Sequence, residues 1–80
     1  MNQTPTTIDL RLFATLAKYR PQQEARQPIR RGMTVAQLMQ ALDIPASEVK
    51  LIFIDGVRAE SDSPLQGGER VGLFPPVGGG

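Results

Sequence analysis

The residues of this sequence with the clearest chemical potential are its last six, which read PPVGGG. Their side chains are unreactive, so the group that can react is the α-carboxylate of Gly80. A terminal carboxylate with a pKa of about 3.5 is ionised and is a poor electrophile at neutral pH. It would need activation, for example as an acyl-adenylate, before a sulfur or amine nucleophile could attack its carbon.

The absence of two residue types limits what the chain can catalyse by itself. The 80 residues include no cysteine and no histidine. Without cysteine the chain has no disulfide, no thiolate zinc site and no cysteine nucleophile, and without histidine it lacks the usual general base near pH 7. We therefore expect a protein that is not an enzyme and that binds no metal or cofactor, with any reaction catalysed by a partner.

The composition of the tail suits a segment that enters a narrow space. Six of the eight glycines fall within residues 67–80. The two prolines end any β-ladder and keep the backbone extended, and the final glycines carry no side chain that would block a channel. Six extended residues reach at most about 20 Å. From the tail alone two other interpretations stay open, a frayed linker and a remnant of an expression vector.

The size and composition of the chain indicate one small globular domain. Its net charge of +1 gives no general reason to bind nucleic acid or a membrane. No apolar run approaches the roughly 20 residues that span a bilayer, and the polar N-terminal residues do not form a signal peptide. We expect a cytoplasmic protein that binds neither nucleic acid nor membranes.

The charges are divided unevenly along the chain. Residues 1–31 carry a net charge of +4, and residues 32–80 carry a net charge of −3. One interpretation is that the two halves neutralise each other within one fold. The other is a basic patch for an acidic partner, formed by Arg26, Arg30 and Arg31. The aromatic residues show no stacking pattern of the kind that binds nucleic acid. They are Phe13, Tyr19, Phe53 and Phe74.

Hydrophobic periodicity predicts the elements of the first part of the chain. Alternation predicts a strand over residues 8–13, with its even-numbered side chains buried and its odd-numbered ones facing outward. Residues 14–19 favour one or two helical turns, which Pro21 ends. Residues 24–31 predict an edge strand or an irregular one, because Pro28 cannot donate to a ladder.

The clearest element is a helix over residues 34–42. Its apolar residues recur at helical spacing, and Thr34 with Gln37 makes a capping-box pattern at its start. A short turn is expected at residues 45–49.

Three strands are predicted after the helix. Residues 51–54 are an apolar run typical of a strand covered on both faces, and Asp55-Gly56 predicts a hairpin turn to a short strand over residues 57–60. The last strand is predicted over residues 69–74, with Phe74 on its outward side.

The order of these elements contains no repeated crossover, which excludes a doubly wound α/β fold. It favours an α+β fold in which a mixed sheet of about five strands wraps around one main helix. The first two strands would pair, and the last would return beside the first. The expected organisation is a flexible segment at residues 1–7, a folded domain at residues 8–74 and a flexible tail at residues 75–80.

The end of the sequence resembles one family closely. Residues 62–80, DSPLQGGERVGLFPPVGGG, are similar to the end of the MoaD branch of the MoaD/ThiS ubiquitin-like sulfur carriers. The shared pattern is a Pro-Leu loop, then a glycine, an acid and a valine, then aromatic-Pro-Pro-Val-x-Gly-Gly. The likeness covers nearly the whole chain from residue 8, although residues 14–31 match only loosely. It implies a β-grasp fold, in agreement with the predicted order of elements.

The resemblance assigns roles to the tail. Gly80 falls on the terminal glycine whose carboxylate is adenylated and converted to a thiocarboxylate, which argues against a vector remnant. The residues before it fall on the stretch that docks against partner enzymes in the family. They are Phe74, Pro75, Pro76, Val77, Gly78 and Gly79.

The resemblance also implies partners and a pathway. The chain would be the non-catalytic small subunit of molybdopterin synthase, and its partners would be an E1-like adenylating enzyme that uses ATP, a sulfur donor and the large subunit. Sulfur would pass to the pterin precursor of the molybdenum cofactor. Three alternatives stay open: a ThiS-like carrier for thiamin or another sulfur pathway, a ubiquitin-like modifier joined through Gly80 to lysines, and an interaction module with an inert tail.

Overall fold

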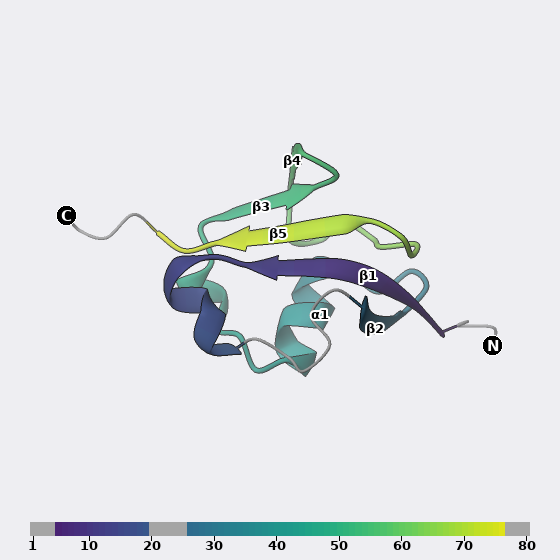
Figure 1. Cartoon of the computed structure of the whole chain (residues 1–80), viewed down its shortest axis with the longest axis horizontal. Coiled ribbons are helices and arrows are strands. Elements are labelled where there is room, and N and C mark those ends of the chain that lie inside the picture. Colours follow the sequence, from purple (N-terminus) through teal and green to yellow (C-terminus); the bar gives the residue numbers. More distant parts are fainter. Residues whose placement is uncertain (1–4, 20–25, 77–80) are drawn as a thin grey trace.

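The computed structural model describes residues 5–19 and 26–76 and places a sheet against one α-helix (Figure 1). In chain order the elements are β1 (Pro5–Leu12), the 3-10 helix η1 (Ala14–Tyr19), β2 (Gln27–Arg30), α1 (Val35–Ala41), the 3-10 helix η3 (Ala46–Glu48), β3 (Leu51–Ile54), β4 (Val57–Ala59) and β5 (Arg70–Phe74). The kind and order of these elements confirm the sequence prediction.

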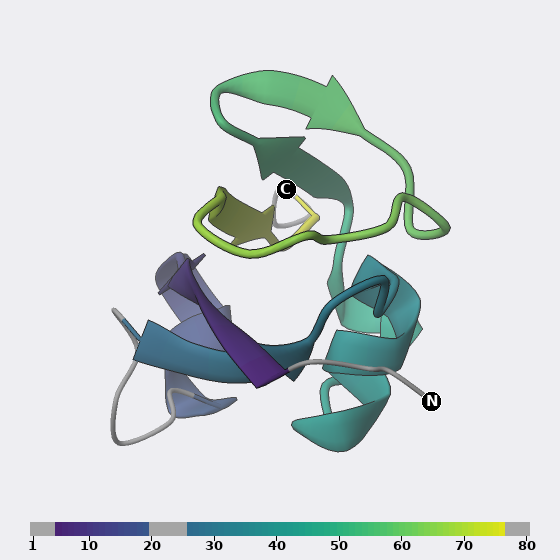
Figure 2. The ribbon, with the colours of Figure 1, turned by 90° about the vertical axis from the view of Figure 1, so that its right-hand side faces the viewer.

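The five strands of the described residues form one mixed sheet in the order β2-β1-β5-β3-β4. β1 and β5 are parallel, and the other neighbouring pairs are antiparallel. The first two strands therefore pair, the last returns beside the first, and β2 is an edge strand, as predicted. Figure 2 shows the sheet curving from β4 to β2 with α1 beside it. This is the β-grasp arrangement.

The first strand is longer than its alternation predicts. β1 begins at Pro5 instead of residue 8, because Pro5, Thr6 and Thr7 pair with Arg30, Ile29 and Pro28 of β2. Residues 5–7 show no alternation of apolar and polar side chains, so the sequence pattern does not predict this part of the strand. Their backbone pairs with β2 while their side chains stay largely exposed. Residues 5–7 thus belong to the sheet and not to a flexible N-terminal segment. Residues 1–4 lie outside the described part of the chain.

The hydrophobic core lies between α1 and the inner face of the sheet. Thr34 caps the helix: its hydroxyl accepts from the Gln37 N–H at 3.1 Å, and the Gln37 side chain accepts from the Thr34 N–H at 3.0 Å. This capping box confirms the predicted helix start. The buried apolar residues are Ile8, Leu10, Leu12, Leu16, Ile29, Val35, Leu38, Met39, Ile44, Ile52, Leu65, Val71 and Leu73.

The predicted burial of β3 on both faces is wrong. Of its four residues only Ile52 is buried, and it faces the core. Phe53 points to the other face of the sheet and is only half-buried. The predicted hairpin that follows is confirmed, because Asp55 and Gly56 have φ of 53° and 83° and join β3 to β4. An apolar run of four residues therefore marks a strand whose outer face is not covered.

A glycine turn before β5 fits closely against the first strand. Gly67 has a φ of 116°, and a Cβ at this position would collide with the side chain of Thr6. The adjacent Gly68 has a φ of 85°, but a Cβ there would meet no atom within 4 Å. Position 67 therefore favours glycine because of both its positive φ and its contact with Thr6, whereas position 68 favours it because of its positive φ alone.

Replacing Gly67 with alanine is expected to lower the free energy of unfolding by about 3 kcal/mol, from left-handed strain plus overlap with Thr6. The control Gly68→Ala should cost only the strain, about 1 kcal/mol. Urea unfolding followed by circular dichroism would measure both. Equal losses would show that the contact with Thr6 contributes nothing.

Candidate functional site

The last strand leads directly into the tail. The ladder continues through Phe74, whose carbonyl accepts from the Lys50 N–H at 2.7 Å. Pro75 has no N–H and therefore ends the pairing. Pro75 is half-buried and Pro76 is exposed. Residues 77–80, which include Val77, Gly78, Gly79 and Gly80 of the predicted site, lie outside the described residues, so their predicted roles stay predictions.

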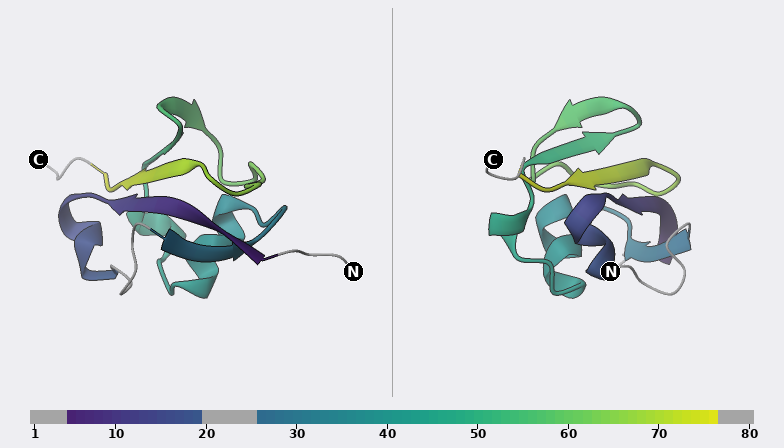
Figure 3. Two further views of the ribbon diagram at one scale, coloured as in Figure 1. Left: turned by 45° about the vertical axis from the view of Figure 1, so that its right-hand side comes forward. Right: turned by 60° about the vertical axis from the view of Figure 1, so that its left-hand side comes forward.

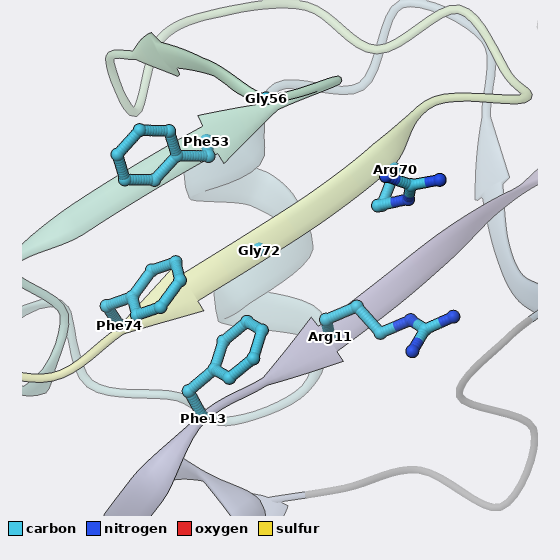
Figure 4. A pocket seen from close by; sticks show the side chains of 7 residues that line it. All are labelled: Arg11, Phe13, Phe53, Gly56, Arg70, Gly72 and Phe74. Atoms are coloured by element: carbon cyan, nitrogen blue, oxygen red, sulfur yellow. The ribbon is translucent and has the colours of Figure 1, made fainter.

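Three phenylalanines gather on the outer face of the sheet beside this exit (Figure 4). The rings of Phe13 and Phe74 are stacked, with centroids 4.3 Å apart and planes at 5°. Phe53 meets the Phe74 ring edge-on, at 5.5 Å and 80°. We call Phe13, Phe53 and Phe74 the aromatic surface. It confirms that Phe74 faces outward. The three rings pack against one another, and the expectation that the aromatic residues form no pattern that binds nucleic acid stays a prediction.

Strand register explains why the three rings meet. β5 lies between β1 and β3, and Gly72 of β5 pairs with Arg11 on one side and with Phe53 on the other. Phe74 lies two residues further along the same face of β5. Phe13 follows β1 directly, and its N–H donates to Leu73 O at 3.2 Å. Figure 3 shows η1 starting at this same end of the sheet.

The missing side chain of Gly72 leaves a hollow in the aromatic surface. The hollow has a volume of about 250 Å³, and the three rings and Gly72 line it together with Arg11 and Arg70. A Cβ on Gly72 would lie 3.4 Å from both the Phe13 and the Phe74 rings, which is ordinary contact. Phe13 is 42% exposed, so this apolar surface is open to solvent. Exposed aromatic patches of this kind are typical of protein-binding surfaces.

Charges border the hollow on one side. The Arg11 guanidinium donates to both carboxylate oxygens of Asp9, at 2.8 and 3.1 Å. This hydrogen bond, helped by the positive charges of Arg11 and Arg70, holds the pKa of Asp9 below its ordinary value against a smaller opposing effect of burial. Because the pKa is lowered in the folded state, the pair stabilises the fold above the unfolded pKa and loses this effect as the pH falls through the folded pKa.

In an NMR titration, the carboxyl carbon of Asp9 is expected to titrate below about 3.9, the usual pKa of aspartate. Arg11→Gln should raise that midpoint, because it removes the hydrogen bond that lowers it most. Arg70→Gln should raise it less, because Arg70 acts through its charge alone. An unchanged midpoint in Arg11→Gln would contradict the assigned pair.

The side chains of the aromatic surface are suited to the recognition of a partner. Within residues 5–19 and 26–76, no three His, Cys, Asp or Glu side chains gather in a way that could hold a metal ion. In the same part of the chain, no helix is long and apolar enough to cross a membrane. The predicted absence of a cofactor stays a prediction. What the surface offers is a contact area of apolar rings bordered by arginines.

The sequence patterns place two members of this surface on the outer face and miss the third. The alternation of the first strand places Phe13 outward, and the period of β5 does the same for Phe74. Phe53 was assigned to a fully buried strand. The basic residues Arg30 and Arg31, in contrast, lie at the opposite end of β1 from the aromatic surface, since Arg30 pairs with Pro5.

Comparisons with known proteins agree with the fold. The sequence model of a family described as Mut7-C ubiquitin matches residues 5–78. No curated protein matches the chain.

Solved structures share the fold. The HVO 2177 protein of Haloferax volcanii, known from a solution structure, superposes with a TM-score of 0.76 at 20% identity, over 100% of this chain and 92% of that one. Crystal structures of the small archaeal modifier protein 1 (SAMP1) of Haloferax volcanii give TM-scores of 0.63 and 0.58 at 22% and 24% identity. They cover 90% and 96% of this chain and 99% and 100% of those chains.

Proposed function

The chain belongs to the Mut7-C ubiquitin family, and on this premise we propose that it is a ubiquitin-like sulfur carrier that reacts through the carboxylate of Gly80. The observation that carries the proposal is the aromatic surface at the end of β5. It places an exposed contact area for a partner directly beside the point where the chain leaves the sheet at Pro75. A partner that binds there has the tail within reach.

The proposed chemistry begins with activation of an unreactive carboxylate. A carboxylate oxygen of Gly80 attacks the α-phosphorus of ATP on an E1-like adenylating enzyme, and pyrophosphate leaves. The resulting acyl-adenylate has a good leaving group. Hydrosulfide released by a sulfur donor then attacks the carbonyl carbon and AMP departs, so that a thiocarboxylate remains. The carrier supplies the reacting carbon and the partners supply the catalytic groups.

The tail sequence suits this division of work. A glycine at the reacting position offers an attacking sulfur little steric resistance, and Gly78 and Gly79 can pass through a channel that other residues would block. Pro75 and Pro76 keep the start of the tail extended. The six residues after Phe74 reach at most about 20 Å, so the activating site has to lie within that distance of the docked aromatic surface.

ATP–pyrophosphate exchange tests the carrier function. When the chain is mixed with an E1-like adenylating enzyme, ATP and radiolabelled pyrophosphate, it is expected to support exchange in proportion to its concentration. The enzyme without the chain should give only background exchange. Exchange that does not depend on the chain would contradict the proposal.

For the destination of the sulfur we propose the molybdopterin pathway, in which the chain would be the small subunit of molybdopterin synthase. The support is the FPPVGGG end of the sequence, which resembles the MoaD branch. The thiocarboxylate form, mixed with the large subunit of the synthase and the pterin precursor, should yield molybdopterin. Failure of this conversion together with formation of the thiazole of thiamin would favour the ThiS-like alternative.

A second function, protein modification, has support of its own. The chain belongs to a ubiquitin family, and SAMP1, which shares the fold, is a small archaeal modifier protein by name. In this case a lysine amine would attack the same adenylate, and an isopeptide bond to Gly80 would form as AMP leaves. Mass spectrometry of digested cell protein should then find lysines that carry a C-terminal fragment of this chain. Their absence would leave the sulfur carrier as the proposal.

A further inference from the structure

A basic groove lies away from the aromatic surface and takes no part in the proposed function. It is an open groove of about 460 Å³ between the end of β2 and the first turn of α1. Its lining consists of Arg30, Arg31, Gly32, Met33 and Gln37. We call these five residues the basic groove.

The side-chain groups that the basic groove leaves for a ligand are hydrogen-bond donors. Neither Arg30 nor Arg31 makes an ion pair or a side-chain hydrogen bond with any described residue, and both are exposed. The side-chain oxygen of Gln37 is already used, because it accepts from the Thr34 N–H at 3.0 Å. Its NH₂ group is left to donate. Among the residues that the structure describes, no carboxylate lines the groove, so the ligand that matches these donors is an anion.

The backbone around the basic groove is already paired. The Gly32 N–H donates to Leu65 O at 2.7 Å, and the Met33 N–H donates to Arg30 O at 2.8 Å. Along the adjoining edge strand, Pro28 has no N–H, and its carbonyl accepts from the Gln27 side chain at 3.1 Å. These backbone groups are already used, so we assign the recognition of a ligand to the arginine and glutamine side chains.

The position of the basic groove allows it to act while the tail is engaged. Arg30 pairs with Pro5 at the start of β1, whereas Phe13 follows the end of that strand. Eight residues of strand separate the two sites by about 25 Å. Figure 1 shows the turn after β2 and the end of β5 at opposite ends of the sheet. A partner docked on the aromatic surface thus leaves the basic groove open.

We propose that the basic groove binds an acidic segment of a second protein, with side-chain carboxylates on Arg30 and Arg31. Two arginines match two carboxylates, each able to form a bidentate pair. Nucleic acid fits less well, because binding it relies on neutralising several phosphates and on aromatic stacking. The groove offers two guanidinium groups and no aromatic ring. The inference is independent of the chemistry proposed for Gly80.

An NMR titration of the ¹⁵N-labelled full chain with a glutamate decapeptide tests this inference. Amide shifts are expected to concentrate on residues 30–37. Arg30→Gln with Arg31→Gln should weaken the apparent affinity about fivefold or more, as expected for the loss of two exposed ion pairs. The matched control, Lys50→Gln with Arg58→Gln, removes the same charge from exposed side chains outside the groove and should leave the affinity unchanged.

Several results would overturn the inference. Amide shifts spread over the whole surface would contradict it, and so would an equal loss of affinity in the control variant. Tighter binding of a ten-nucleotide oligouridylate at the same amides would show that the ligand is a nucleic acid instead. Thermal unfolding of each variant checks the fold. Because the two guanidinium groups make no side-chain hydrogen bond or ion pair within the described residues, the melting temperature should change little.

Discussion

Replacing Phe74 with glutamate is expected to weaken binding to the adenylating enzyme about 30-fold or more, the effect of losing an aromatic residue at the centre of an interface. Phe74 is the member of the aromatic surface that touches both of the others, stacked on Phe13 and edge-on to Phe53. A carboxylate at this position would remove the shared contact area and place a charge in an apolar interface. Isothermal titration calorimetry with the purified enzyme would measure the loss.

A matched variant separates the effect of losing the Phe74 ring from the effect of adding one negative charge to the surface. Val57 on β4 is 67% exposed and lies outside the aromatic surface, so Val57→Glu introduces the same charge at another exposed apolar position. It should bind the enzyme as the unchanged chain does. Loss of the ring contacts is also expected to cost Phe74→Glu about 1 kcal/mol of stability, which thermal unfolding can check. Unchanged affinity in a folded Phe74→Glu variant would show that the enzyme docks elsewhere.

Deleting Gly80 is expected to reduce ATP–pyrophosphate exchange at least about 100-fold, because a misplacement of about 1 Å in a reacting group already costs that much. The shortened chain still ends in a glycine carboxylate, Gly79. That carboxylate stops about 3.5 Å short of the α-phosphorus, the length of one extended residue. The chemistry of the carboxylate is unchanged and only its position differs, so the experiment tests whether the tail must be long enough to bring this group to the α-phosphorus.

Binding to the enzyme should respond differently to this deletion. The aromatic surface is untouched, so the affinity should stay within about threefold of that of the unchanged chain, well below the effect of a lost hot spot. Phe74→Glu is thus expected to lose binding, and the deletion to lose reaction. Full exchange activity after the deletion would contradict the role of Gly80.

Local patterns in the sequence predicted most of the fold. The alternation of residues 8–13 placed Leu10 and Leu12 in the core and Phe13 outside it. Thr34 and Gln37 predicted the helix start because the capping box depends on two residues three positions apart. Each of these features involves neighbours along the chain, which is why a single sequence carries them.

The parts that were missed depend on pairing between distant residues. The early start of β1 follows from its register with β2, which brings Pro5 opposite Arg30. Phe53 was assigned to a buried strand because four apolar residues in a row do not reveal which face is covered. The hollow beside Gly72 exists because β1, β5 and β3 lie side by side, and no local motif encodes that order.

The central claim is that the carboxylate of Gly80 is the reacting group, and the mass of the intact protein tests it most directly. The chain is incubated with the adenylating enzyme, ATP and a sulfur donor, and is then weighed and fragmented. We predict a mass increase that matches replacement of one oxygen by sulfur, located on Gly80 and absent without ATP. An unchanged mass in the presence of an active enzyme, or sulfur found on any other residue, would contradict the account.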